Sequence, residues 1–430
     1  MAAPTPRLRY ANRSQQELRT DSLDQLLPPE HPARAVWAFV ERLDLTELLA
    51  HIRSVPGGPG APATDPRVLL AVWLYATGRG IGSGRTLAEL CENHLAYRWL
   101  AGGLSINHHT LSDFRTGAGE LLDRLLTESV AVLMHQGLME LDRVAQDGLK
   151  VRAAAGRSSF RRPATIERCL AEARGQVEAL KRQADEDAGG AGRRQRAAQQ
   201  RAAADRAARL EAAERELGQI RTDNAEKRKD RQKPPAELRC STTDPQARTM
   251  KMADGGFRPA YNVQLATATE GGVIVGVAVT QAGHDAEQLT PMLEQLARRY
   301  GRRPKDVLID GGFVSRAAFD AAHGGGTAVY APLKEPDKRR AGGKDPGAAK
   351  PGDGAGVIAW RARMGTDAAM AVYRERAATA EWANAQLCNH GLRRFRLRGL
   401  AKVLVEALWQ AVTHNLGRLL AAGRPAVAAG

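Results

Sequence analysis

The sequence predicts a mixed α/β protein with an all-helical N-terminal domain and a long helical insertion. Three features of the chain support this prediction. Apolar residues follow helical spacing up to about residue 135, and an Ala-, Glu-, Gln- and Arg-rich stretch at 164–235 repeats its apolar residues in heptad steps. Beyond residue 257, short apolar strands alternate with helices, which is typical of a sheet with helices on both faces.

The length of 430 residues is enough for two or three domain-sized units. We expect a helical domain at 1–135 and an α/β domain at 136–424. The second domain would be interrupted by the helical insertion at 164–235 and by a flexible loop at 335–356, which is rich in Gly, Pro, Lys and Asp.

The chain is basic and has enough apolar residues to form a core. Lys and Arg total 63 against 48 Asp and Glu, a net charge of +15, which indicates a polyanionic partner, nucleic acid before a membrane surface. The 43% apolar content excludes a wholly disordered chain, and no apolar run approaches the ~20 residues of a membrane helix. The first 15 residues lack the apolar segment of a secretory signal, so we expect a cytoplasmic protein.

The four cysteines are scattered, and no two form a CxxC pair. A disulfide framework or a zinc site is therefore not expected. We expect the protein to work in a reducing compartment. These cysteines are Cys91, Cys169, Cys240 and Cys388.

Two features of the N-terminal domain raise the question of ligand binding. Alternating glycines at 78–84 follow a helix rather than a strand and lack a Lys-Ser/Thr pair, so they indicate a turn between helices rather than a phosphate loop. Residues 107–115 begin a second helix, for which Thr110 is a candidate cap with Asp113 three residues later. Helix, turn and helix with polar and basic residues resemble a helix-turn-helix, in which Thr110 and Arg115 would contact DNA. A helical bundle without DNA contact is the alternative.

The insertion at 164–235 is predicted to form a helical hairpin. Ile166, Leu170, Ala173, Val177 and Leu180 step by four and three residues, and glycines at 189–192 interrupt the pattern. A basic second half at 193–233 is compatible with a solvated face crossed by ion pairs, with DNA contact or with dimerisation.

Five strands are expected in the α/β domain. Antiparallel strands come first and strand–helix alternation follows, so the sheet is predicted to be mixed. The strands are expected at 139–147, 260–266, 273–279, 305–310 and 327–332, and the helices at 285–300, 317–322, 367–388 and 400–420.

Two of these strands end on an aspartate followed by glycine, Asp147 and Asp310. If the strands are neighbours, both carboxylates project from one end of the sheet. A third carboxylate is expected from the helix at 367–388, where Glu375 and Glu381 point in different directions. Glu381 lies among alanines that permit close packing on the sheet, whereas Glu375 lies between two arginines. We therefore choose Glu381.

Three carboxylates without a thiol or imidazole suit Mg²⁺ or Mn²⁺ rather than zinc. Two such ions can stabilise the attacking and leaving oxygens of a phosphoryl displacement. Taken alone the pattern is weak, because Asp-Gly at a strand end is more often a turn than a ligand.

Longer strings are far more specific, and they resemble the DDE transposases of bacterial insertion sequences over nearly the whole chain. The three acidic blocks are VAQDG at 144–148, LIDGGF at 308–313 and YRERAATAE at 373–381. The other strings are LLAVWLYA at 69–76, HTLSDFR at 109–115, GGFRPAYNVQ at 255–264, RFRLRGLAKV at 394–403 and HNL at 414–416.

The resemblance implies a ribonuclease H-like domain with a mixed five-stranded sheet. It also implies cleavage and strand transfer at the ends of an insertion sequence, dependent on two Mg²⁺ or Mn²⁺ ions. Asp147, Asp310 and Glu381 map to the family's catalytic, metal-binding triad, and Tyr373 and Arg376 map to positions expected near DNA phosphate.

The chain departs from the family at one position. Cys388 stands where related transposases place a basic residue about two turns after the Glu, and Arg393 or Arg394 is a candidate substitute. A basic block without an acid follows, which is expected either to track DNA phosphates or to form an exposed helix face. The block consists of Arg393, Arg394, Arg396, Arg398 and Lys402.

The resemblance further implies double-stranded DNA partners, namely terminal inverted repeats and target DNA. A homodimer on paired ends and a nucleoid-associated location in a bacterial cytoplasm are also implied. A non-catalytic DNA-binding protein from a decayed element is the alternative. A coiled-coil scaffold would leave both Asp-Gly strands unexplained.

Overall fold

The computed structural model describes residues 20–50, 52, 54, 61–186, 193–343 and 345–421. The leader at 1–15 and the glycine interruption at 189–192 lie outside these residues. None of the helices in the described part of the chain has the length and apolar character to cross a membrane.

The N-terminal region is helical, as predicted. Asp65 caps α3 by accepting a hydrogen bond from the Arg67 amide at 2.8 Å, and Pro66 begins the helix. Helix α3 is buried on almost every side, so the other helices pack around it. The helices are α1 (Pro32–Glu41), α2 (Thr46–Ala50), α3 (Pro66–Gly78), α4 (Gly84–Asn93), α5 (Leu95–Leu100), α6 (His108–Gly117) and α7 (Gly119–His135).

Helix α6 begins three residues earlier than predicted. Its cap is Asn107, whose side chain accepts a hydrogen bond from the His109 amide at 2.8 Å, whereas Thr110 lies within the helix. Asn is at least as good a cap as Thr, so the earlier residue starts the helix.

The sheet is mixed, as predicted. Its path runs β4–β5–β1–β7–β8, and β6 also pairs with β5. Strand β1 is antiparallel to β5 and parallel to β7, and β7 is parallel to β8. The strands are β1 (Arg143–Arg152), β4 (Arg248–Lys251), β5 (Phe257–Ala268), β6 (Ile274–Thr280), β7 (Asp306–Leu308) and β8 (Ala328–Tyr330).

Two details of the sheet differ from the prediction. The sheet has six strands rather than five, because β5 is long enough to pair with β4 over 257–260 and with β6 over 262–267. Strand β1 does not end at Asp147 but continues to Arg152, which pairs with Ala260. Pairing with β5 therefore outweighs the local Asp-Gly turn signal.

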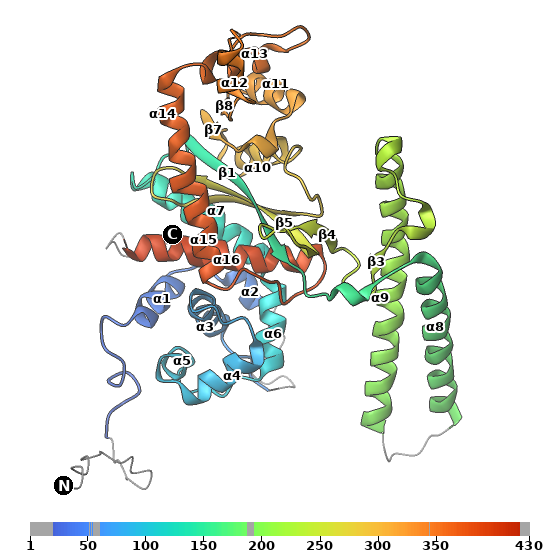
Figure 1. Cartoon of the computed structure of the whole chain (residues 1–430). Coiled ribbons are helices and arrows are strands. Elements are labelled where there is room, and N and C mark those ends of the chain that lie inside the picture. Colours follow the sequence, from blue (N-terminus) through green and yellow to red (C-terminus); the bar gives the residue numbers. More distant parts are fainter. Residues whose placement is uncertain are drawn as a thin grey trace, which may run out of the picture.

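The helices of the α/β region cover both faces of the sheet. A continuous rod begins with α14 (Asp367–Arg376), passes through a π-helical turn (Ala377–Glu381) and ends with α15 (Trp382–Asn389). Helix α16 (Leu400–Ala421) lies between the sheet and the N-terminal helices (Figure 1). The remaining helices are α10 (Leu289–Tyr300), α11 (Arg316–Gly324), α12 (Pro336–Ala341) and α13 (Ala355–Met364). Helix α12 lies within the segment 335–356, so the prediction of a loop throughout this segment was wrong.

The predicted insertion forms a helical hairpin of α8 (Pro163–Glu186) and α9 (Arg193–Ala225). Leu170, Ala173 and Leu210 form part of the seam between the two helices. The hairpin stands away from the sheet and is joined to it near the short pair β2 (Phe160–Arg161) and β3 (Cys240–Ser241) (Figure 1). Its outer faces are therefore exposed to solvent.

Asn415 fastens α16 to the sheet. Its side chain accepts from the Ile274 amide at 2.9 Å and donates to the Ile274 carbonyl at 2.8 Å, and both contacts are buried. We expect Asn415→Ala to lower the free energy of unfolding by about 1–3 kcal/mol, because two backbone groups lose their partner. Urea denaturation would measure this, with Gln219→Ala as control, since Gln219 makes an exposed contact with Asp223. Equal losses in the two variants would contradict the prediction.

Candidate active site

Asp147 lies in the middle of β1 with its side chain 16% exposed. Its Oδ2 accepts a hydrogen bond from Asn384 Nδ2 at 2.9 Å, and its Oδ1 lies 3.3 Å from Arg376 Nη2. Both partners come from the rod of α14, the π-helical turn and α15, which therefore crosses β1 at this carboxylate (Figure 1).

Arg376 also reaches Glu381, with Nη1 3.5 Å from the Glu381 Oε1. One guanidinium thus spans two of the three candidate acids. Glu381 is 64% exposed, whereas the preceding Ala380 is buried against Ala145 and Leu308 of the sheet. The small side chain of Ala380 allows the π-helical turn to lie close to the strands, as expected from the alanine-rich sequence.

Asp310 lies two residues beyond β7 and caps a 3₁₀ turn at Gly311–Phe313, where its Oδ1 accepts from the Gly312 amide at 2.8 Å. Arg143 of β1 pairs in parallel with Asp306 of β7, so the same register continued by four residues brings Asp310 level with Asp147, and its charge acts on Asp147. Burial, followed by the charges of Asp310 and Asp285, raises the pKa of Asp147 to about 6, although Arg376 opposes this rise.

The charges of the three candidate acids all act on the Tyr373 hydroxyl. Burial raises its pKa, and the negative charges of Asp310, Asp147 and Glu381 contribute to the rise, whereas Arg376 opposes it. Among the residues that the structure describes, no three His, Cys, Asp or Glu side chains are close enough together to hold a metal ion. The acids are thus electrostatically coupled but are not arranged as ready ligands.

Glu375 has a different environment. It accepts two hydrogen bonds from Arg143 Nη1, at 2.9 and 3.0 Å, and Arg143 also binds Asp306. This ion pair joins α14 to the beginning of β1 and β7. The position of Glu375 between two arginines suggested a solvated charge cluster, whereas in the structure it pairs with Arg143 of β1.

A polar group that was not predicted from the sequence lies behind Asp147. Asp285 accepts hydrogen bonds from Asn262 Nδ2 at 2.7 Å and Gln264 Nε2 at 2.6 Å, on the strand beside β1. A Cβ at Gly148 would clash with Asp285, so this glycine is needed for close packing rather than for a turn. Two amides in a buried strand, Asn262 and Gln264, were the available signal.

The predicted DNA-binding residues have different environments. The basic block Arg393, Arg394, Arg396, Arg398 and Lys402 is exposed, mostly in the connection between α15 and α16 rather than on a helix face. Arg394 lines a groove of about 520 Å³ together with Arg152, Arg157, Arg258 and the exposed Phe257. Cationic side chains beside an exposed ring are typical of nucleic-acid surfaces.

Thr110 is exposed, but the structure does not place Arg115 where DNA could reach it. Arg115 is buried, pairs with Glu406 at 2.9 Å and donates to the Gly82 carbonyl at 2.7 Å. The sequence motif shows that the residue is charged but not that α16 covers it with a carboxylate.

Two comparisons with known families bear on this site. Residues 21–117 match the family described as Transposase domain (DUF772), and residues 237–416 match the family described as Transposase DDE domain. No curated protein and no solved structure matches the chain. The second family match contains Asp310 and Glu381, whereas Asp147 lies between the two matched regions. Together the matches cover well over half of the chain, and the mixed sheet agrees with them. The chain belongs to the DDE transposases of insertion sequences and has their ribonuclease H-like fold.

Proposed function

We propose that the chain cuts DNA at the ends of an insertion sequence and transfers the cut strand to target DNA, with Asp147, Asp310 and Glu381 as the catalytic carboxylates. Family membership supports a DNA transposase function with DNA as substrate. The observation that carries the residue assignment is the contact of one guanidinium, that of Arg376, with both Asp147 and Glu381. Asp310 acts electrostatically on the same site.

The donor chemistry fits a hard divalent cation. All three side chains offer carboxylate oxygens. The pKa of Asp147 is raised by burial first and then by the charges of Asp310 and Asp285, and a bound cation would stabilise the ionised carboxylate against both effects. Asp147, Asp310 and Glu381 would hold two Mg²⁺ or Mn²⁺ ions, which would stabilise charge on the attacking and leaving oxygens when bound. Arg376 occupies oxygens of Asp147 and Glu381, so it must leave them when cations bind.

The remaining residues position the DNA. Arg376, once released, would bind a DNA phosphate, and Tyr373, whose pKa responds to the charges of the same acids, would contact the DNA near it. The arginines around Phe257 and the exposed basic block would bind the backbone on either side of the cut. Catalysis then rests on positioning and charge stabilisation, with no covalent enzyme intermediate. Two copies on paired ends and a nucleoid-associated location are parts of the same proposal.

A matched pair of variants on one helical rod tests the assignment. With Mg²⁺ or Mn²⁺ and DNA containing the element's end, we expect Glu381→Gln to reduce nicking by about a hundredfold or more, because charge stabilisation is worth several kcal/mol. Glu375→Gln, six residues earlier, should retain most of the nicking, since Glu375 binds Arg143. If Glu375→Gln lost nicking while Glu381→Gln retained it, Glu375 and not Glu381 would be the third catalytic carboxylate. DNA binding by wild-type protein without any nicking would favour the non-catalytic alternative.

A further inference from the structure

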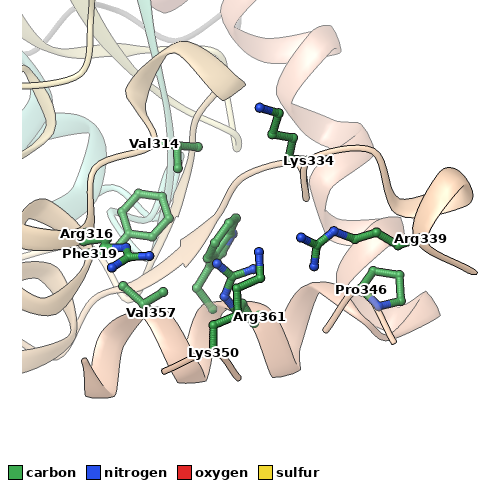
Figure 2. Close-up of a pocket in the computed structure, with 10 residues that line it drawn as sticks. Val314, Arg316, Phe319, Lys334, Arg339, Pro346, Lys350, Val357 and Arg361 are labelled. Carbon is green, nitrogen blue, oxygen red and sulfur yellow. The ribbon is translucent and has the colours of Figure 1, made fainter. Parts of the chain in front are cut away.

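A second cationic site lies beside the candidate active site. A partly open cavity of about 190 Å³ is lined by α11, α12, α13, the segment after β8 and the segment between α12 and α13 (Figure 2). Five basic side chains line it, and Val314, Phe319, Val357 and Trp360 provide an apolar wall. The basic residues are Arg316, Lys334, Arg339, Lys350 and Arg361.

These five cations are only partly balanced, because a single acid pairs with two of them. Asp353 is fully buried and pairs with Arg361 at 2.7 Å and with Arg316 at 3.7 Å. Within the described part of the chain, no acidic side chain forms an ion pair with Lys334, Arg339 or Lys350. The cavity therefore carries an excess of positive charge.

The cations also face one another. In Figure 2 the Arg339 guanidinium points toward Lys350 and Arg361 across the cavity. Burial, followed by the charges of Arg361 and Arg339, lowers the pKa of Lys350. An anion between these groups would remove the repulsion, and its size is limited, because ~300–1,000 Å³ is usual for a drug-sized ligand and this cavity is smaller.

The cavity lies at the edge of the sheet where β7 ends, close in sequence to Asp310. Strands β7 and β8 are parallel, so both end at the same edge of the sheet. Asp310 follows β7 by two residues, and Lys334 follows β8 by four. Val314, which lines the cavity, comes directly after the 3₁₀ turn capped by Asp310.

From this arrangement, and resting on the proposed function, we propose that the cavity binds a phosphate of the DNA backbone on the Asp310 side of the cut. Arg339, Lys350 and Lys334 supply the charges that hold the phosphate, and the apolar wall lies against the adjoining sugar. The site thereby fixes how far the DNA strand advances past Asp310. It recognises backbone and not base sequence, because charged groups that bind phosphate read no base edge.

Two neighbouring residues of α12 provide a matched test. Arg339 lines the cavity, whereas Lys338 on the same helix is 80% exposed and lies outside it. We expect Arg339→Glu to weaken binding of a fluorescein-labelled 30-base-pair duplex about tenfold in anisotropy titrations of the full chain. It should also reduce the slope of log K against log salt by about one. Lys338→Glu makes the same charge change and should leave both quantities nearly unchanged.

Each other outcome overturns the proposal. Equal weakening by both variants would mean that only the overall charge matters, and no weakening by either would mean that DNA does not reach the cavity. If deoxyadenosine monophosphate raises the melting temperature of wild type but not of Arg339→Glu, while both bind DNA equally, the phosphate belongs to a free nucleotide. These measurements use binding alone, so they stay interpretable even if Glu381→Gln retains its nicking and the proposed catalytic function fails.

Discussion

Asp147→Asn is expected to reduce DNA nicking by about a thousandfold or more and, at the same time, to stabilise the fold at pH 8. The loss of activity follows from removing a carboxylate whose charge stabilisation is worth several kcal/mol, at ~1.4 kcal/mol for each tenfold in rate. The gain in stability follows from the pKa of about 6, which lies above the ordinary value of 3.8 because the carboxyl is buried near Asp310 and Asp285.

The pH dependence has a definite sign. A raised pKa means that the folded state binds the proton more tightly than the unfolded chain, so this stability is present below about pH 4 and is lost as the pH rises toward 6. Asn resembles the protonated acid and avoids that loss. The gain at pH 8 should be at most about 3 kcal/mol, from ~1.4 kcal/mol per pKa unit, and it should nearly vanish at pH 4.

Urea denaturation of wild type and Asp147→Asn at both pH values measures this difference. Asp254→Asn is the control, because hydrogen bonding to Arg258 lowers the pKa of Asp254 and its removal should not stabilise the protein at pH 8. In addition, Mg²⁺ should raise the melting temperature of wild type more than that of the Asp147 variant. A gain of the same size at pH 4 and pH 8 would refute the electrostatic explanation.

Glu406→Ala is expected to lower the free energy of unfolding by about 3–5 kcal/mol, the usual effect of removing one partner of a buried ion pair. Glu406 binds Arg115 at 2.9 Å and also accepts hydrogen bonds from the backbone amides of Arg396 and Leu397. The variant leaves Arg115 charged and buried over the ring of Trp73, where it loses its acidic partner.

Replacing both Arg115 and Glu406 by Leu should restore part of the lost stability, because an apolar pair needs no partner in the core. Glu128→Ala serves as the control, since Glu128 pairs with Arg124 at the surface. Its removal should lower the free energy of unfolding by less than about 1 kcal/mol. If the double variant were less stable than Glu406→Ala, the pair itself would not be the cause.

Much of the fold could be predicted from the sequence because periodicity is a local property. The hairpin of α8 and α9, the β5–β6 pair and the helical rod that bears Glu381 all follow from residue spacing. Strand β4 could not be found in this way. Its sequence, RTMK, has little strand character and becomes a strand because β5 offers an open edge.

The site was predictable in its charges but not in its contacts. Asp147, Asp310 and Glu381 stood out by spacing and by family strings, and their roles stay predictions. Asn384, which donates to Asp147, belongs to an ordinary stretch of helix and gave no signal. Arg115 was misjudged because its burial depends on α16, which lies almost three hundred residues further along the chain.

The position of the α8–α9 hairpin between β1 and β5 has a consequence for how the chain folds. These two strands are neighbours in the sheet, yet the whole hairpin separates them in the sequence, so during synthesis β1 leaves the ribosome long before its partner exists. Helical hairpins form through contacts between residues close in sequence, which are the fastest to make. Once formed, the hairpin brings its two ends together at the β2–β3 pair. The pairing of β1 with β5 then has to close a much shorter effective loop. An element remote from the chemistry can thus hasten assembly of the strand that bears the first acid.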